Sequence, residues 1–256
     1  MSRRGTEQRG YQEDFSDLIT GVFDRVSRER KAETMLRVLK AHFAERLPAC
    51  RLLDVGASTG IIDAYMAAHV GEVIGIDIDA KALAFACRHH ATDCLGFARA
   101  DALRLPVADA AVDIVVCAHV YEHVPDAERL MQEIERVLKP GGVCYFAAGN
   151  RFQLIEPHYR IPLLSALPRP LAHWLIRRLG VAERYHELHF SLWGLRRLTA
   201  RFRRHDYTLR LIREPERFAT TYMVPATGLR ARVIQLSAGL LYALIPTYVW
   251  LLEKER

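Results

Sequence analysis

The chain has 256 residues, of which 50% are hydrophobic and 26% charged, and its formal net charge is +6. This is the composition of an ordinary globular protein, and the length suits one large domain or one domain with an appendage. The sequence shows no aromatic and basic repeat of the kind that binds single-stranded nucleic acid, so a nucleic-acid partner is not expected. The five cysteines form no CxxC pair, which argues against a disulfide framework and a cysteine zinc site.

The N-terminal stretch MSRRGTEQRGYQEDF has no apolar core and does not resemble a secretory signal, so a cytoplasmic location is the expectation. Apolar residues recur at helical spacing between Phe15 and Leu47, which predicts one or two helices ahead of Pro48.

Strands and helices then alternate along the chain. Apolar runs predict strands at 51–55, 72–77, 95–100, 111–118 and 143–148, and helical spacing predicts helices at 61–70, 80–90 and 126–138. Lys139-Pro-Gly-Gly142 is a typical ending for the last of these helices. The alternation predicts right-handed βαβ units and a parallel sheet, and continuous apolar strands predict a sheet covered on both faces.

The pattern breaks after Asn150. Residues 151–190 are rich in proline, arginine and aromatic residues, and a helix at 192–204, a strand at 207–212, a helical stretch at 229–244 and a strand at 247–253 follow. The prediction is one α/β domain over residues 1–256, with a Rossmann-like, mostly parallel, seven-stranded sheet, helices on both faces and a helical cap inserted after the fifth strand. Its parts are N-terminal helices (1–47), a cofactor-binding core (48–149), the cap (150–190) and the rest of the sheet (191–256).

Ligands of an open parallel sheet bind at the carboxyl ends of its strands. Gly56 and Gly60 follow the first strand and allow the backbone to approach a ligand, and the helix that begins there offers free N–H groups. Asp77 ends the second strand about 20 residues later, where a carboxylate can accept both hydroxyls of a ribose. The loop lacks the GxGxxG pattern that cradles a pyrophosphate. Asp54 stands before the first glycine, and Asp101 follows the third strand at the edge where an adenine would lie.

Five segments, at 52–60, 75–78, 99–102, 113–124 and 138–142, resemble in order the motifs of class I S-adenosylmethionine-dependent methyltransferases. The resemblance implies S-adenosylmethionine as cofactor, with the glycines beside its methionine part, Asp77 on the ribose, Ile78 against the adenine and Asp101 on the adenine amine. His119 would lie over the methionine part, near the transfer site. The full set of cofactor-binding candidates is Asp54, Gly56, Ala57, Ser58, Gly60, Asp77, Ile78, Asp101, Ala102 and His119.

Two alternatives bear on this set. Asp54 and Asp101 are also residues that cap turns and helices. The family often has a further glycine where this chain has Ser58, and a side chain there narrows the loop.

The segment from His119 to His123 spells H-x-x-E-H, a pattern of one class of zinc peptidases. That chemistry needs both histidines on one helix face, whereas His119 directly follows a strand, so no metal is predicted.

Methyl transfer depends mostly on positioning, but an oxygen acceptor also needs a proton acceptor, for which histidine suits neutral pH. His158, His186 and His189 are weak candidates for this role, because all three lie in the segment that would cover the site. Ordinary surface or core histidines are the alternative, so the catalytic residue stays open.

The cap mixes apolar residues with Arg169, Arg177 and Arg178, a mixture that suits either an ordinary amphipathic helix or contact with anionic lipid. Val233–Leu252 holds 20 residues without a charge, and a membrane span, an interfacial helix and a buried helix followed by a strand all remain open for it. The layout of the cap also resembles, loosely, that of quinone-precursor O-methyltransferases.

The function predicted from the sequence is methyl transfer to a small-molecule acceptor, for which a lipophilic or lipid-linked compound and an oxygen atom are favoured. The alternative is a non-catalytic S-adenosylmethionine-binding scaffold of the same fold. A nucleic-acid or protein methyltransferase is disfavoured, because no N-P-P-Y-like element follows the fourth strand. A membrane surface is retained as a partner, and no oligomeric state is predicted.

Overall fold

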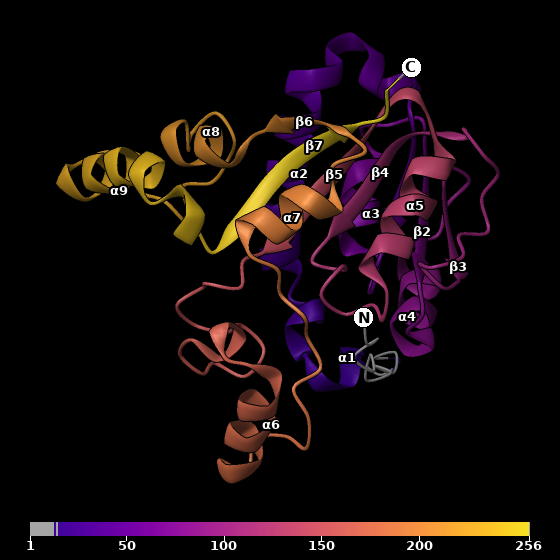
Figure 1. The fold of residues 1–256 in the computed structure, drawn as a ribbon. Coiled ribbons are helices and arrows are strands. Elements are labelled where there is room, and N and C mark those ends of the chain that lie inside the picture. Colours follow the sequence, from indigo (N-terminus) through magenta and orange to yellow (C-terminus); the bar gives the residue numbers. More distant parts are fainter. Residues whose placement is uncertain (1–12, 14, 256) are drawn as a thin grey trace.

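A computed structural model describes residues 13 and 15–255, so most of the stretch predicted to carry no secretory signal lies outside the described residues. Its seven strands form one sheet in the order β3-β2-β1-β4-β5-β7-β6 (Figure 1). Only β7 runs against the others, because it pairs antiparallel with both β5 and β6. The predicted fold class is therefore confirmed. The strands are β1 (Arg51–Val55), β2 (Glu72–Asp77), β3 (Leu95–Arg99), β4 (Val112–Ala118), β5 (Leu138–Gly149), β6 (Arg203–Asp206) and β7 (Thr247–Glu253).

Helices cover both faces of the sheet, as the apolar strands indicate. In β4, Ile114 and Val116 face one core while Val115 and Cys117 face the other, which is why this strand has no polar face. The first core is closed by α2, α3 and α8, and the second by α5 and α7. The helices are α1 (Phe15–Leu18), α2 (Arg25–Phe43), α3 (Ile61–Ala67), α4 (Ala80–His90), α5 (Ala127–Val137), α6 (Arg169–Arg178), α7 (Leu192–Leu198), α8 (Thr208–Arg213) and α9 (Leu229–Leu240), with 3-10 turns η1 (Thr20–Phe23), η2 (Ala44–Ala49), η3 (Leu164–Ala166) and η4 (Tyr242–Leu244).

The strand predicted at 207–212 is wrong, because those residues form α8 and the sixth strand lies earlier, at β6. The cause is a contact with a distant strand: the Thr208 side chain accepts a hydrogen bond from the backbone N–H of Val249 at 3.1 Å, which takes the place of a ladder bond to β7. The chain then turns into a helix that buries Leu211. The helix predicted at 192–204 is correspondingly shorter, since Arg203 and Arg204 belong to the strand.

The segment between β5 and α7 forms the predicted cap, with a small core of its own made by Leu164, Ala172, Ile176 and Tyr185. The helix expected in the apolar C-terminal run is present as α9, and the strand expected after it is β7. However, α9 is not buried: it projects from the body of the protein next to α8 (Figure 1). Within the described residues, none of the helices is long and apolar enough to cross a membrane.

Candidate functional site

The glycine loop after β1 adopts a backbone that favours glycine. Gly56 has φ 89° and Gly60 has φ 70°, both in the left-handed region. A Cβ on Gly56 would meet Val120 at 2.6 Å, and one on Gly60 would meet Phe97 at 2.6 Å, so neither position has room for a side chain. Ser58, where the family often has glycine, is also left-handed at φ 52°.

Asp77 is fixed beside this loop at the end of β2. Its two carboxylate oxygens accept hydrogen bonds from the backbone N–H of Ser58 at 2.8 Å and of Asp79 at 2.9 Å. Burial raises the pKa of Asp77, while the bonds from Asp79 and Ser58 act in the opposite direction. Each carboxylate oxygen retains acceptor capacity, so the half-buried group can bind a diol as the sequence predicts.

Asp54 does not face the open edge but is buried in a charged cluster with Asp63 of α3. Burial, together with the charge of Asp77, raises the pKa of Asp54 to about 7. Burial and Asp54 likewise raise the pKa of Asp63 well above its ordinary value. A half-buried arginine of α2, Arg28, lies in the field of these acids, although burial lowers its pKa. The fold thus brings Arg28, from a helix distant in sequence, close to these acids beside the glycine loop.

The adenine side of the site is less distinct. Ile78 and Ala102 are partly exposed, as residues that contact a ligand should be. The Asp101 carboxylate accepts a hydrogen bond from the backbone N–H of Leu103 at 2.8 Å, so it caps a turn, which is the alternative that its residue type suggests. Its contact with adenine stays a prediction.

His119 lies directly after β4 with its ring about half exposed. Its Nδ1 is 3.2 Å from Oε1 of Glu122, a fully buried carboxylate. Burial raises the pKa of Glu122, but the hydrogen bond and charge of His119 and the charges of neighbouring histidines outweigh it and lower this pKa to about 2. One ring nitrogen of His119 is thus held by a buried carboxylate, while the ring stays partly exposed.

Two of the three histidines predicted in the cap join this region. The rings of His158 and His189 lie 6.5 Å apart, and a Cβ on Gly149 would meet the His189 ring at 2.9 Å, beside Glu122. His186 is exposed and stands apart from them. His189 has a hydrogen-bond partner on each ring nitrogen, Tyr185 at 3.1 Å and Gln153 at 3.3 Å, and its role as a proton acceptor stays a prediction.

The N-terminal segment covers this edge, which the sequence did not indicate. The backbone N–H of Ser16 donates to Asp79 at 2.8 Å, and the Thr59 hydroxyl donates to the carbonyl of Val22 at 2.7 Å. Phe15 packs edge-on against His123. Sequence reasoning missed Phe15 and Arg28 because each is an ordinary helix residue whose role depends on contacts with distant segments.

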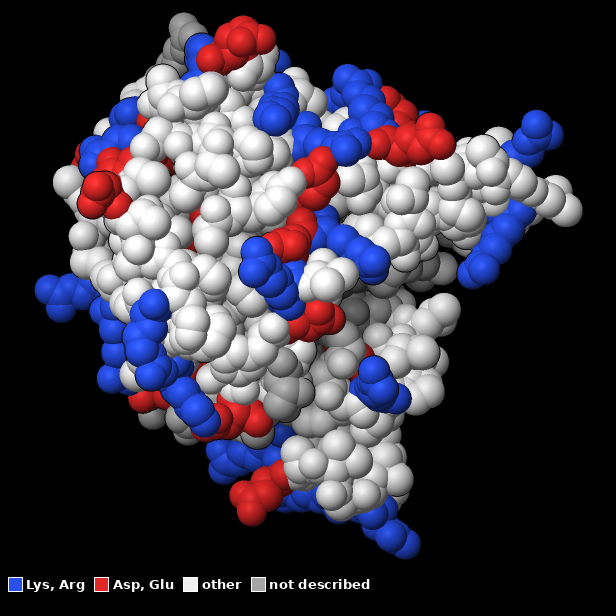
Figure 2. Space-filling model, turned by 180° about the vertical axis from the view of Figure 1, so that it is seen from behind, with Lys and Arg blue, Asp and Glu red and all other residues white. Residues whose placement is uncertain are grey.

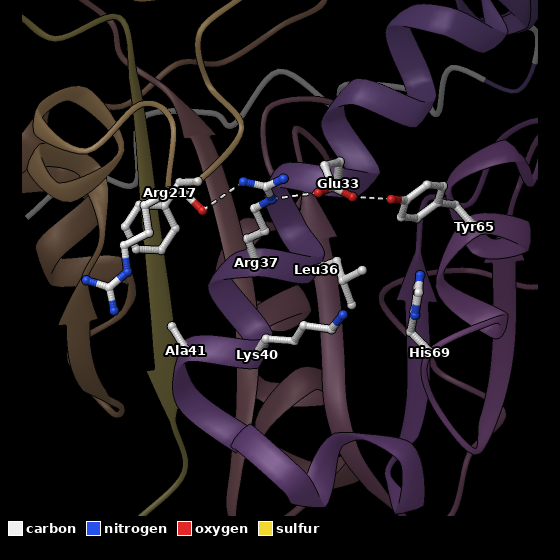
Figure 3. Close-up of a pocket in the computed structure, with 9 residues that line it drawn as sticks. Glu33, Leu36, Arg37, Lys40, Ala41, Tyr65, His69 and Arg217 are labelled. Atoms are coloured by element: carbon white, nitrogen blue, oxygen red, sulfur yellow. Dashed lines mark hydrogen bonds and ion pairs between the residues drawn. The ribbon is translucent and has the colours of Figure 1, made fainter. Parts of the chain in front are cut away.

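A separate groove of about 530 Å³ lies between α2, α3 and the chain after α8 (Figure 3). Glu33 accepts hydrogen bonds from Arg37 and from the Tyr65 hydroxyl, and Arg37 continues to the carbonyl of Glu216 at 2.6 Å. The groove lies away from the glycine loop, toward the end of α3 that is opposite Gly60. The polar side chains named above form hydrogen bonds within the groove. It is therefore not the cofactor site.

The comparisons with known proteins agree with this architecture. Residues 53–146 match a family model described as a methyltransferase domain. The ubiquinone biosynthesis O-methyltransferase of Hahella chejuensis is 33% identical over 172 residues, which are 62% of this chain and 71% of that relative. The biotin biosynthesis bifunctional protein BioHC of Cellvibrio japonicus is 36% identical over 124 residues, but this match spans only 24% of its length. A methyltransferase structure from Mesorhizobium loti superposes with a TM-score of 0.55 at 16% identity, covering 86% of this chain and 98% of that one, which shows the shared fold.

The chain thus belongs to the class I S-adenosylmethionine-dependent methyltransferases, as its motifs predict, and S-adenosylmethionine is its cofactor. The left-handed glycine loop and the position of Asp77 beside it are compatible with that cofactor.

Proposed function

We propose that this protein transfers a methyl group from S-adenosylmethionine to an oxygen of a small lipophilic acceptor. The observation that carries the proposal is the convergence of the glycine loop, Asp77 and His119 at one edge of the sheet, between the ends of β1, β2 and β4. The names of two relatives, a ubiquinone biosynthesis O-methyltransferase and a malonyl-acyl-carrier-protein O-methyltransferase, support oxygen as the acceptor atom.

Different residues of the chain would bind different parts of the cofactor. The backbone of Gly56 and Gly60 would border the methionine part, and Asp77 would accept the ribose hydroxyls. Arg28, the cation in the cluster of buried acids, would attract the methionine carboxylate. When bound, the cofactor supplies a methyl group on a sulfonium sulfur, and in-line attack by the acceptor oxygen breaks the C–S bond and leaves a neutral thioether. The protein's main contribution to such a step is to hold the reactants in line.

The acceptor would approach between His119 and the cap. We place a lipophilic molecule there because the outer faces of the cap and of α9 are apolar and basic. In α9, Leu229, Val233, Leu236 and Leu240 form one exposed stripe, with Leu236 80% and Leu240 88% exposed. In α6, Trp174 is exposed beside Arg177 and Arg178.

These two faces would contact an anionic membrane surface. Figure 2 shows the arm formed by α9 as a largely uncharged projection with basic side chains near its end. An apolar stripe flanked by arginines is the pattern of helices that lie in the plane of a lipid interface. A lipid-linked acceptor could then enter the site from the membrane.

The test of the cofactor site is calorimetric titration with S-adenosylmethionine and S-adenosylhomocysteine. Asp77→Ala removes a charge-assisted hydrogen bond worth roughly 1.5–3 kcal/mol, which is about ten- to a hundredfold in affinity. Asp93→Ala, at an exposed position away from the loop, is the matched control and should bind as the wild type does. Unchanged binding by Asp77→Ala would refute the ribose assignment.

Turnover is tested separately, with a panel of lipophilic phenols and soluble polar acceptors. Methylation of the lipophilic compounds is the expected result, and activity restricted to polar acceptors would refute the acceptor class. Cofactor binding without turnover on either group would support the non-catalytic scaffold.

A further inference from the structure

Three side chains from distant segments converge beside the transfer site. His123 lies in the turn between β4 and α5, His158 in the turn after β5, and Glu187 in the extended chain before α7. Each offers one ligand atom, and these three atoms all lie within 4.8 Å of one another. Nδ1 of His123 is 4.0 Å from Oε1 of Glu187, and the rings of His123 and His158 are nearly perpendicular, with centroids 5.0 Å apart.

A second layer of hydrogen bonds orients His158. Oε1 of Glu156 is 2.7 Å from Nδ1 of His158, and Oε2 of Glu156 accepts the backbone N–H groups of His158 and Tyr159 at 2.8 and 2.7 Å. The carboxylate thus fixes the ring and its tautomer and leaves Nε2 as the ligand atom. Proteins commonly orient metal-binding histidines with a carboxylate in this way.

The charge of this region also suits a cation. The carboxylates of Glu122, Glu156 and Glu187 are all at least 98% buried within one small volume. A divalent ion would offset the buried negative charge, which is costly in an apolar environment.

We propose that His123, His158 and Glu187 bind a first-row divalent metal ion, with zinc the best fit. Two imidazoles and one carboxylate are a ligand set of catalytic zinc sites, which keep a position open for water or substrate. Imidazole ligands select such ions over Mg²⁺ and Ca²⁺, which prefer oxygen. The proposed site differs from the zinc site of H-x-x-E-H peptidases, in which both histidines of the motif bind the metal. Here His123 is the motif histidine in the site, because His119 contacts Glu122 instead.

The site adjoins the place where the acceptor would react, because the backbone N–H of Leu188 donates to the carbonyl of Glu122 at 2.9 Å and Glu122 binds His119. The acceptor hydroxyl would give an oxygen lone pair to the metal and lose its proton to water, which makes the oxygen nucleophilic at neutral pH. This role rests on the proposed O-methylation, whereas the metal site itself does not.

The test is metal binding by the full chain after treatment with a chelator and its removal. Zn²⁺ affinity is measured by competition with a chromogenic chelator, and Co²⁺ is added as a spectroscopic probe whose visible bands report its coordination. We expect one equivalent of Zn²⁺, with Mg²⁺ failing to compete. His158→Ala and Glu187→Gln should weaken binding at least a hundredfold, and Glu156→Gln, which alters only the orienting layer, about ten- to a hundredfold.

The matched control is His186→Ala, at an exposed histidine adjacent to Glu187, and it should bind Zn²⁺ as the wild type does. His158→Gln is a second variant in case His158→Ala does not unfold cooperatively. No Zn²⁺ binding by the wild type, or equal binding by His158→Gln, Glu187→Gln and the wild type, would overturn the proposal. Zn²⁺ binding by a chain that methylates no acceptor would uphold the site and refute its role in O-methylation.

Discussion

In the glycine loop, Ser58 has a backbone conformation that costs stability but places its N–H against Asp77. Ser58 holds a left-handed backbone that costs a residue with a Cβ roughly 1–2 kcal/mol. Its N–H donates to Asp77, so the strained residue helps to orient the carboxylate predicted to hold the ribose. With Ser58 in place of the family's glycine, the hydrogen bond from the backbone N–H of residue 58 to Asp77 is still present. The Ser58 side chain, which the sequence suggests narrows the loop, therefore does not displace the Asp77 carboxylate.

The buried pair of Asp54 and Asp63 makes stability depend on pH. Because burial and Asp54 raise the pKa of Asp63 above its ordinary value near 3.8, the folded chain holds a proton that the unfolded chain releases. The free energy of unfolding therefore falls as pH rises from about 4 through the folded pKa. Asp63→Asn keeps the shape and removes this titration, so it should stabilise the protein more at pH 8 than at pH 5.

Urea unfolding at the two pH values measures this difference. Asp93→Asn, at an exposed carboxylate, serves as the control for a change of one surface charge. An equal effect of Asp63→Asn at both pH values would show that this carboxyl is not the source of the dependence.

Among the structural elements, the start of the cap is held to the chain before β7 by the side-chain amide of Asn150. Nδ2 of Asn150, which is fully buried, lies 2.9 Å from the carbonyls of both Ala243 and Ile245 and 3.1 Å from the Tyr248 hydroxyl. Asn150→Ala would leave those carbonyls without their donor, at a cost of roughly 1–3 kcal/mol. We expect a lower midpoint in urea and faster proteolysis of the cap.

Asn150→Asp is the informative companion, because it keeps the shape but replaces the donor with a carboxylate oxygen that faces the two carbonyls. It should be at least as destabilising as Asn150→Ala. Wild-type stability in Asn150→Asp would show that the donor does not matter.

For the whole molecule, the exposed surfaces of α9 and of the cap are the candidate contacts with a membrane. If their apolar and basic faces contact an anionic membrane, the chain should co-sediment with vesicles that contain phosphatidylglycerol and less with pure phosphatidylcholine. Binding should weaken with salt, since exposed charges are screened. Leu236→Glu together with Leu240→Glu should reduce it about tenfold or more, because two exposed apolar anchors become anionic.

Val26→Glu, at an exposed apolar position on α2, controls for added negative charge. Equal vesicle binding by the α9 variant and the wild type would refute the membrane contact. Self-association abolished by the same variant, without vesicle binding, would assign the stripe to a second copy of the chain instead.

Most strands of the central sheet and the glycine loop could be predicted from local sequence patterns. The structure has four elements at the predicted residues: β1, β2, β7 and α4. They could be predicted because apolar periodicity and glycine positions are local signals, which depend on residues close together in the sequence. The positions of Gly56, Gly60 and Asp77 follow from the same local rule, since each comes directly after a parallel strand.

Features that depend on distant contacts or on solvation could not be predicted from the sequence. The Tyr207–Ile212 run alternates like a strand, yet Thr208 bonds to β7 and starts a helix. The sequence left the run at 233–252 open between a membrane span, an interfacial helix and a buried helix followed by a strand, whereas in the structure the leucines of α9 are exposed and β7 is buried. Arg28 meets the buried acids, and His123, His158 and Glu187 meet one another, because the chain folds segments from separate parts of the sequence over one edge of the sheet.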